Sequence, residues 1–149
     1  MTPTPANGKE LIFVQRTIEF FLHLIPPTAT HQEKAVRVVN GKPRFYEPES
    51  LKQARAKLTG HLARHRPEAP LVGPLELVTG WYFPSTDAHP DGSWRTTRPD
   101  TDNLQKLLKD CITGVGFWQD DAQVCREIAE KFYSNLPGIR IRVRELVKP

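Results

Sequence analysis

Cysteine is scarce in this sequence. The chain of 149 residues contains only two, Cys111 and Cys125, and no CxxC pair. This count excludes a zinc ribbon, which needs paired ligands, and a small disulfide scaffold, which needs more cysteines. We therefore expect two buried, reduced thiols, a state typical of the cytoplasm.

Long apolar runs are also missing. The longest apolar-leaning stretch, Leu11 to Ile25, is interrupted by four polar or charged residues: Gln15, Arg16, Glu19 and His23. A helix that spans a bilayer needs about 20 consecutive apolar residues. The preceding segment lacks the basic region of a signal peptide, and no small-residue cleavage site follows. We therefore expect a cytoplasmic protein that does not contact a membrane.

Acidic residues are outnumbered by basic ones. The 21 Lys and Arg against 17 Asp and Glu give a formal net charge of +4, and the isoelectric point is about 9.2. Basic side chains gain affinity for nucleic acids by releasing counterions from phosphates. The charge thus favours an anionic partner but does not identify one. A hydrophobic content of 38% and a charged content of 26% are typical of one globular domain.

Hydrophobic periodicity predicts an α+β domain. Periods of two and of about 3.6 indicate a strand, a hairpin, a helix, a strand, a helix and two strands, over residues 17–25, 35–48, 48–65, 75–83, 103–113, 127–134 and 139–146. Asn40 and Gly41 suit the tight turn of the hairpin. We expect about two helices packed on a mixed sheet in a domain over residues 17–147. An N-terminal extension, residues 1–16, precedes it, and the loop over residues 84–99 is long enough to be functional.

Aspartates are concentrated in one short segment. Five of the seven lie within residues 98–123: Asp100, Asp102, Asp110, Asp120 and Asp121. Asp100 and Asp102 lie where the loop meets the second helix, and Asp121 joins them if the following turn brings the chain back along that helix. Carboxylates placed close together repel. A divalent cation such as Mg²⁺ removes this conflict, and two such ions can hold the attacking and leaving oxygens of a phosphodiester.

Structural explanations compete with the metal site. Asp102 and Gln105 have the spacing of a helix capping box, and Lys106 has the spacing of a salt-bridge partner for Asp102 and Asp110. A calcium loop does not fit, because the positions that need Gly and Glu carry other residues. His61 and His65 have the spacing of a zinc pair, but no third ligand is evident.

The segment RPDTDNLQKLLKDCITGVGFWQDDAQV, residues 98–124, resembles the signature of RusA-type Holliday junction resolvases. In that family D-x-D-N-L-x-K opens a helix and W-x-D-D-x-Q follows. The resemblance implies that Asp100, Asp102 and Asp121 bind metal, that Lys106 is the catalytic lysine, and that Asp120 supports the same cluster. The rest of the chain matches only in the order of its elements.

The family implies a homodimeric, Mg²⁺-dependent endonuclease, with Mn²⁺ as a substitute ion, that nicks two opposing strands of a four-way DNA junction. Two alternatives stay open. One is a nuclease with the same chemistry that acts on other branched or flapped DNA, because a metal site does not define the shape of the substrate. The other is a non-catalytic DNA-binding protein whose acids only cap a helix.

Arginines provide candidate DNA contacts. Three of them, Arg140, Arg142 and Arg144, alternate along the last predicted strand, so they share one face. They could contact phosphates, or they could pair with Glu127 or Glu130 across a hairpin. Two loop arginines, Arg95 and Arg98, lie beside the acids and are further candidates. We assign Trp81 and Trp118 to the core.

Overall fold

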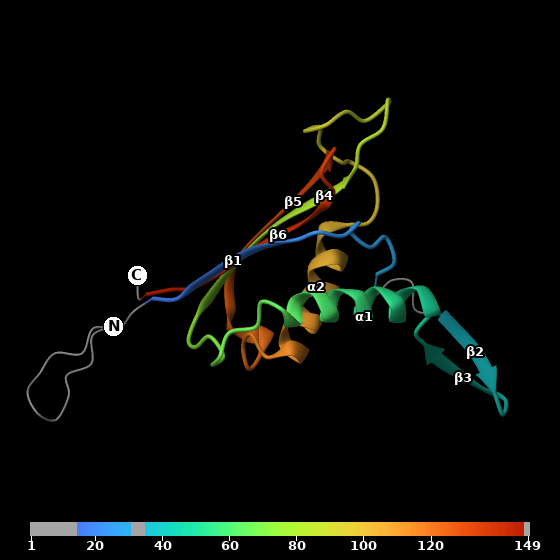
Figure 1. Ribbon diagram of the computed structural model, residues 1–149. Helices are drawn as coiled ribbons and strands as arrows, with labels where there is room; N and C mark the ends of the chain where they lie inside the picture. Colours follow the sequence, from blue (N-terminus) through green and yellow to red (C-terminus); the bar gives the residue numbers. More distant parts are fainter. Residues whose placement is uncertain (1–14, 31–34, 148–149) are drawn as a thin grey trace, which may run out of the picture.

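A computed structural model describes residues 15–30 and 35–147, and its centre is a mixed four-stranded sheet (Figure 1). The strands are β1 (Thr17–Leu22), β4 (Leu75–Pro84), β5 (Val124–Ser134) and β6 (Gly138–Glu145). Their order is β1-β6-β4-β5. The β4–β5 pair is parallel, and the other two pairs are antiparallel.

Two helices, α1 (Glu49–Ala63) and α2 (Thr101–Val115), cover one face of this sheet (Figure 1). The alternating residues of β4 point into the core beneath the helices, as the period of two predicts. The core includes the following side chains, each at most 1% exposed: Leu51, Leu58, Leu62, Leu75, Leu77, Trp81, Phe83, Leu104, Leu107, Leu108 and Trp118. The α+β fold and the placement of Trp81 and Trp118 in the core are confirmed.

The predicted hairpin is present as β2 (Ala35–Val39) and β3 (Lys42–Tyr46), which form a separate two-stranded sheet. Asn40 and Gly41 form its turn with φ angles of 52° and 74°, the positive values that a type I′ turn requires. Figure 1 shows the hairpin projecting away from the main sheet beyond α1.

The order of the strands in the sheet corrects one expectation. The last two strands, β5 and β6, are not hairpin partners, because β4 lies between them. The reason is that α2 connects β4 to a parallel neighbour, and a parallel pair needs such a crossover. Consequently Glu127 and Glu130 of β5 do not lie beside the arginines of β6.

Other expectations need smaller corrections. The first strand ends at Leu22 instead of Ile25, and α2 begins at Thr101, two residues before its predicted start. Cys111 is buried as expected, but Cys125 is exposed, and both thiols are free. The expected N-terminal extension lies outside the described residues, apart from Gln15 and Arg16. None of the helices that the structure describes is long and apolar enough to cross a membrane.

Candidate active site

Two of the predicted metal ligands, Asp100 and Asp102, lie together at the N-terminal end of α2. Asp100 is the N-cap residue and Asp102 is in the first turn, and both side chains are exposed. A carboxylate at the N-cap usually accepts a backbone N–H bond from the first turn. The Asp100 side chain makes no such bond. Its oxygens are therefore not committed to holding the helix end.

Asp102 also borders a cavity of about 340 Å³ between α2 and β5. Its lining residues are Thr101, Asp102, Gln105, Lys109, Glu127 and Ala129. Lys109 Nζ donates a hydrogen bond to Glu127 Oε1 at 3.1 Å. The cavity thus brings a second carboxylate, from β5, to the same side of α2 as Asp102.

Gln105 fixes this second carboxylate through a buried network. Its side-chain oxygen accepts hydrogen bonds from Thr79 Oγ1 at 2.7 Å and Trp81 Nε1 at 3.0 Å. Its amide nitrogen donates to Glu127 Oε2 at 2.7 Å. The capping box of Asp102 and Gln105 is therefore not formed, because the Gln105 side chain points into the core, where it is 4% exposed.

The loop before Asp100 is fastened to β5 by Lys131. Its Nζ donates to the carbonyl oxygens of Thr97 and Pro99, both at 2.8 Å. Burial, together with the charge of Arg95, lowers the pKa of Lys131, while the nearby negative charge of Asp100 opposes this shift. Lys131 thus places a cation beside Asp100.

Arg95 also holds the loop. Its guanidinium lies 4.2 Å from the centre of the Phe83 ring, and it donates two hydrogen bonds to the carbonyl oxygen of Arg98. This arrangement gives Arg95 a structural role. The Arg98 side chain is exposed beside Asp100.

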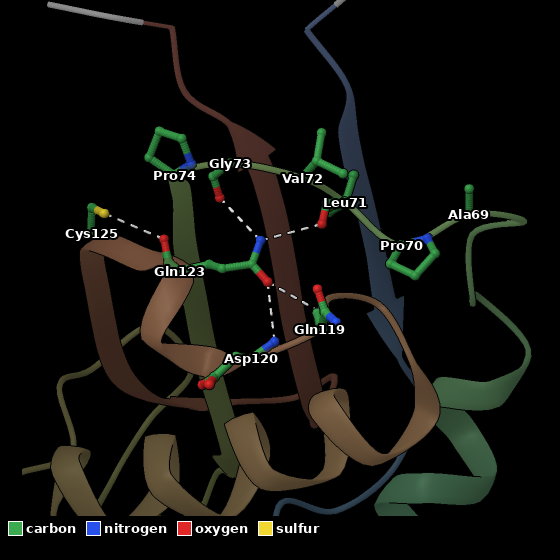
Figure 2. Close-up of a pocket in the computed structure, with 10 residues that line it drawn as sticks. All are labelled: Ala69, Pro70, Leu71, Val72, Gly73, Pro74, Gln119, Asp120, Gln123 and Cys125. Atoms are coloured by element: carbon green, nitrogen blue, oxygen red, sulfur yellow. Dashed lines mark hydrogen bonds between the residues drawn. The ribbon is translucent and has the colours of Figure 1, made fainter.

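The other two acids of the motif lie beyond the opposite end of α2. Asp120 caps the short 3₁₀ helix η2 (Asp121–Gln123), and its carboxylate accepts the backbone N–H of Ala122 at 2.9 Å. Figure 2 shows the reciprocal half of this capping box, in which Gln123 accepts the N–H of Asp120. Asp120 thus has a structural partner, whereas Asp121 has no comparable task in the box.

The three predicted metal ligands do not converge within one chain. Asp100 and Asp121 flank α2, whose fifteen residues span about 22 Å. Within residues 15–30 and 35–147, no three His, Cys, Asp or Glu side chains are grouped so that they could hold a metal ion. The turn after α2 leads into β5 at the far end of the helix and does not return to its start.

Lys106, the predicted catalytic lysine, lies on the exposed side of α2. Its Nζ is 3.4 Å from Asp110 Oδ1, and 56% of its side chain is exposed. The predicted spacing of an i,i+4 pair with Asp110 is confirmed. Because such exposed pairs are weak, Lys106 is available to a bound anion.

The arginine row of β6 has acidic partners that differ from the expected ones. Arg140 donates to Glu19 Oε1 at 2.6 Å. Arg142 and Arg144 donate to Glu76 at 3.3 and 3.1 Å. Burial alone would raise the pKa of Glu76, but hydrogen bonding and charge from Arg126, Arg144 and Arg142 lower it instead.

Comparison with known proteins shows the family of the chain. The family model of the endodeoxyribonuclease RusA matches residues 25–144 of the chain. The chain belongs to the RusA endodeoxyribonuclease family. A crossover junction endodeoxyribonuclease rusA of Lactococcus phage r1t is 28% identical over 130 residues, which are 86% of this chain and 98% of the phage protein. The uncharacterized protein YqaN of Bacillus subtilis (strain 168) is 28% identical over 118 residues, which are 72% of this chain and 82% of YqaN.

Membership of the RusA family makes the chain an endonuclease that hydrolyses phosphodiester bonds of DNA. It excludes the alternative of a non-catalytic DNA-binding protein. The matched region contains both ends of α2, and therefore the five aspartates of the motif segment.

Sequence reasoning missed three charged residues at the candidate site. These are Lys109, Glu127 and Lys131, which contact the cavity or the loop before Asp100. Glu127 and Lys131 lie four residues apart on one strand, so they share a face. The spacing of Glu127 and Lys131 can be read from the sequence. That both side chains face α2 follows only from the position of β5 as the parallel neighbour of β4. His65 stacks on Phe20 with a ring separation of 4.3 Å, which gives that histidine a packing role instead of a zinc ligand's role.

Proposed function

We propose that this RusA-family endonuclease is a cytoplasmic, homodimeric enzyme that resolves four-way DNA junctions in recombination and repair. It would nick two opposing strands, with Mg²⁺ as its cofactor and Mn²⁺ as a substitute. The observation that carries the proposal is the pair Asp100 and Asp102 at the start of α2, inside the matched family region, with Asp100 free of the cap bond that its position favours.

The chemistry of the donors fits a hard divalent cation. Asp100 and Asp102 offer exposed carboxylate oxygens, the ligands that Mg²⁺ prefers. When bound, Mg²⁺ would lower the pKa of the attacking water and neutralise charge on the phosphate. Lys106 would place a positive charge beside the scissile phosphate, where negative charge grows in the transition state. Gln105 and Lys109 would keep Glu127 in position next to Asp102.

The separation of Asp121 from Asp100 suggests where the dimer enters the chemistry. If Asp121 is a ligand of the same site, the length of α2 prevents it from reaching Asp100 of its own chain. A two-fold axis, by contrast, brings the end of one α2 near the start of another in many arrangements. We therefore propose that Asp121 of the partner subunit completes each site, and that Asp120 is kept for its capping bond.

Mixed dimers test this arrangement. Asp100→Asn and Asp121→Asn should each be inactive as homodimers. A heterodimer of the two variants would contain one site that has lost both acids and one site that is intact. We expect it to nick one strand of a labelled four-way junction in Mg²⁺. Two differently tagged chains, refolded together and purified by both tags, provide the sample.

The outcomes separate two models. If each site is built from one chain, the heterodimer has one defect in each site and stays inactive. A monomeric protein that cleaves would contradict the dimer directly. Full activity of the Asp121→Asn homodimer would remove Asp121 from the site, and a heterodimer of Asp100→Asn with Asp102→Asn serves as the control, because it should stay inactive in both models.

The DNA contacts that we propose are Arg98 and the β6 arginines, with Arg140 as the clearest test. Its partner Glu19 is 45% exposed, so the pair can open to a phosphate at little cost. Arg140→Gln should weaken junction binding and reduce the slope of log affinity against log salt by about 0.9. Glu19→Gln is the matched control, and it should strengthen binding. An unchanged slope in Arg140→Gln would exclude a phosphate contact there.

Junction specificity is a separate question from cleavage. Other branched or flapped DNA remains the alternative substrate, because the same acids could cut it. Labelled four-way junction, flap and linear duplex, each incubated with protein and Mg²⁺, decide between them. We expect symmetric nicks in the junction and little cutting of duplex, whereas preferred cutting of the flap would favour the alternative.

A further inference from the structure

A row of aromatic side chains lies on the face of the sheet that the helices do not cover. It contains Phe21 of β1, Tyr82 of β4, Phe132 of β5 and Trp94 of the loop after β4. Tyr82 and Phe132 are stacked with ring centres 5.4 Å apart and an interplanar angle of 16°. Trp94 follows at 4.4 Å from Phe132, and Phe21 lies 6.1 Å from Tyr82. We call these four residues the aromatic row.

Trp94 is the exposed end of the row. Its side chain is 61% exposed, while the other two tryptophans, Trp81 and Trp118, are at most 1% exposed. An exposed indole gives up the free energy of burial, which for such a large side chain is substantial. The contact with Phe132 buries only part of the indole, so packing alone does not account for a tryptophan at this position.

The backbone holds Trp94 firmly in this exposed place. Residues 92–95 run beside the end of β5, where Tyr133 donates to Ser93 and accepts from Gly92, at 2.8 and 2.9 Å. Arg95 donates its backbone N–H to Lys131 at 3.0 Å. The indole is thus presented by a fixed segment, which reduces the entropy that a ligand must overcome on binding.

The rings of Tyr82 and Phe21 lie close to the backbone of the sheet. This is a consequence of two glycines, Gly80 and Gly138. A Cβ atom added at Gly80 would lie 2.9 Å from the Tyr82 ring, and one added at Gly138 would collide with the Phe21 ring. Because the glycines leave room, the Tyr82 and Phe21 rings can lie against the backbone beside Phe132 and Trp94. Aromatic side chains gathered along a basic surface are those on which nucleic-acid bases stack.

The row lies close to the proposed metal ligands. Phe132 follows Lys131, whose side chain on the opposite face of β5 holds the carbonyl oxygen of Pro99, the residue before Asp100. Only the thickness of one strand separates the two sites. A DNA strand at Asp100 therefore needs to pass only the edge of β5 to reach Phe132 and Trp94.

The charges around the row favour DNA over a second copy of the chain. Arg140 lies beside it with a side chain 49% exposed, and Arg126, Arg142 and Arg144 follow on the same face, 31% to 54% exposed. These four arginines outnumber the two glutamates with which they pair, Glu19 and Glu76. In a symmetric dimer through this face, an arginine-rich surface would meet its own copy, and like charges repel. A phosphate backbone complements the same surface.

We propose that the aromatic row is a stacking platform for unpaired bases of the branched DNA strand. The inference rests on the proposed junction-resolving function, and it specifies the part of the substrate that is recognised. Bases inside a duplex are stacked on one another and have no free face. Those at a branch point can be displaced onto Trp94 and its neighbours, so the row would favour branched over linear DNA.

Trp94 fluorescence tests the platform without cleavage. With Mg²⁺ replaced by EDTA, the wild-type protein is titrated with a dT oligonucleotide, a four-way junction and a blunt duplex of equal nucleotide content. The dT strand and the junction should quench the emission of Trp94, while the duplex should leave it nearly unchanged. The buried tryptophans, Trp81 and Trp118, supply a constant background.

Variants separate stacking from general binding. Trp94→Ala should lose the quenching and weaken binding of the dT strand by roughly 5- to 100-fold, the effect of one lost stacking partner. Trp94→Phe should recover most of the affinity, because it restores an aromatic face. The control is Val72→Ala, since Val72 is 54% exposed before the start of β4, far from the row, and its loss should change neither binding nor quenching.

Three results would overturn the platform. They are affinity of Trp94→Ala within twofold of wild type, equal quenching by blunt duplex, and emission that depends on protein concentration without DNA, which would indicate a second copy on this face. Junction cleavage is measured separately in Mg²⁺. Cleavage with no quenching refutes the platform alone, whereas quenching with no junction cleavage refutes the proposed function alone.

Discussion

The two ends of α2 each carry a pair of aspartates, but the structure uses them differently. At the C-terminal end, the Asp120 carboxylate accepts the N–H of Ala122 and belongs to a complete capping box. At the N-terminal end, Asp100 stands in the cap position and makes no side-chain cap bond. The Asp120 carboxylate is thus committed to the backbone, whereas the Asp100 carboxylate is available to a ligand.

The helix dipole makes this difference informative. Negative charge is stabilised near a helix N-terminus and destabilised near a C-terminus. Asp100 and Asp102 lie at the favourable end of α2, so they need no further partner to be tolerated. Asp120 follows the unfavourable end, where its own N–H partner compensates. Charge placement alone therefore cannot distinguish a ligand from a cap, but the bonds that each carboxylate makes can.

Replacing an acid at each end of α2 should give the largest difference in junction cutting. Asp100→Asn or Asp102→Asn should lower junction cutting by at least about 10³, because removing a metal ligand costs several kcal/mol of transition-state stabilisation. Binding measured in EDTA should be unchanged or tighter, since negative charge near DNA is lost. Initial nicking rates and gel-shift affinities check both statements.

Asp120→Ala is the matched change at the other end. We expect it to cut the junction within a few-fold of wild type and to lose about 0.5–2 kcal/mol of unfolding free energy, the usual cost of a lost helix cap. If Asp120→Ala instead abolished cutting while the fold stayed intact, the distinction between a committed Asp120 and an available Asp100 would be wrong.

Lys106, between the two ends, should give the next largest effect. If it stabilises charge in the transition state, Lys106→Ala should lower turnover by about 10² to 10³ with the fold retained. Lys106→Arg, which keeps the charge, should retain part of the activity. If Lys106 only pairs with Asp110, Lys106→Ala would cost about 0.2–0.5 kcal/mol of stability and leave the nicking rate unchanged.

Much of the fold could be predicted from the sequence because its signals are local. The turn at Asn40 and Gly41 and the apolar stripe of α2 follow from backbone preference and periodicity. Which strands lie side by side in the sheet does not follow from these local signals. The position of β4 between β5 and β6 depends on the crossover through α2, which joins residues far apart in the sequence. As a result, Glu127 bonds Lys109 and Gln105 and does not lie beside the arginines of β6.

The candidate site shows the same limit. The motif located Asp100, Asp102 and Asp121 in the sequence, but its linear spacing does not reveal whether α2 separates them or a turn joins them. The task of Asp120 was visible only partly, since Gln123 has capping-box spacing from it. The aromatic row could not be found from sequence, because its four members come from three strands and a loop whose order in space is not written in the chain.

Gln105 supports the N-terminal end of α2 and Gln123 the Asp120 end, and replacing them should lower the free energy of unfolding by different amounts. Gln105 is 4% exposed, and it accepts bonds from Thr79 and Trp81 inside the core. Gln105→Leu leaves buried polar atoms without their acceptor and should cost about 1–3 kcal/mol. Gln123 bonds backbone groups of which all but the part-buried Leu71 carbonyl are exposed to water, so Gln123→Leu should cost about 0.5–1.5 kcal/mol. Urea unfolding compares them, and equal losses would contradict the contrast.

The smallest expected effect is a pH dependence that reaches the Asp120 end through Glu145. The Glu145 side chain is 1% exposed and accepts the N–H of Val72 at 2.8 Å. Val72 lies between Leu71 and Gly73, whose carbonyl oxygens accept the amide of Gln123 (Figure 2). Burial alone would raise the pKa of Glu145, but bonds from Arg16 and Val72 lower it below its ordinary value of 4.5.

A carboxyl group with a lowered folded pKa stabilises the fold above its unfolded pKa. This contribution should therefore be complete above pH 4.5 and lost as the pH falls through the folded pKa of Glu145. Glu145→Gln should be less stable than wild type at pH 7 by about 1 kcal/mol or less, because Arg16 is 37% exposed and solvent screens the pair. The difference should shrink toward pH 3. At pH 7, amide hydrogen exchange in Glu145→Gln should be faster than in wild type at Val72 but not at Leu104, near Asp100. A stability difference that is constant from pH 7 to pH 3 would show that Glu145 does not support the Asp120 end selectively. Faster exchange at both amides would show the same.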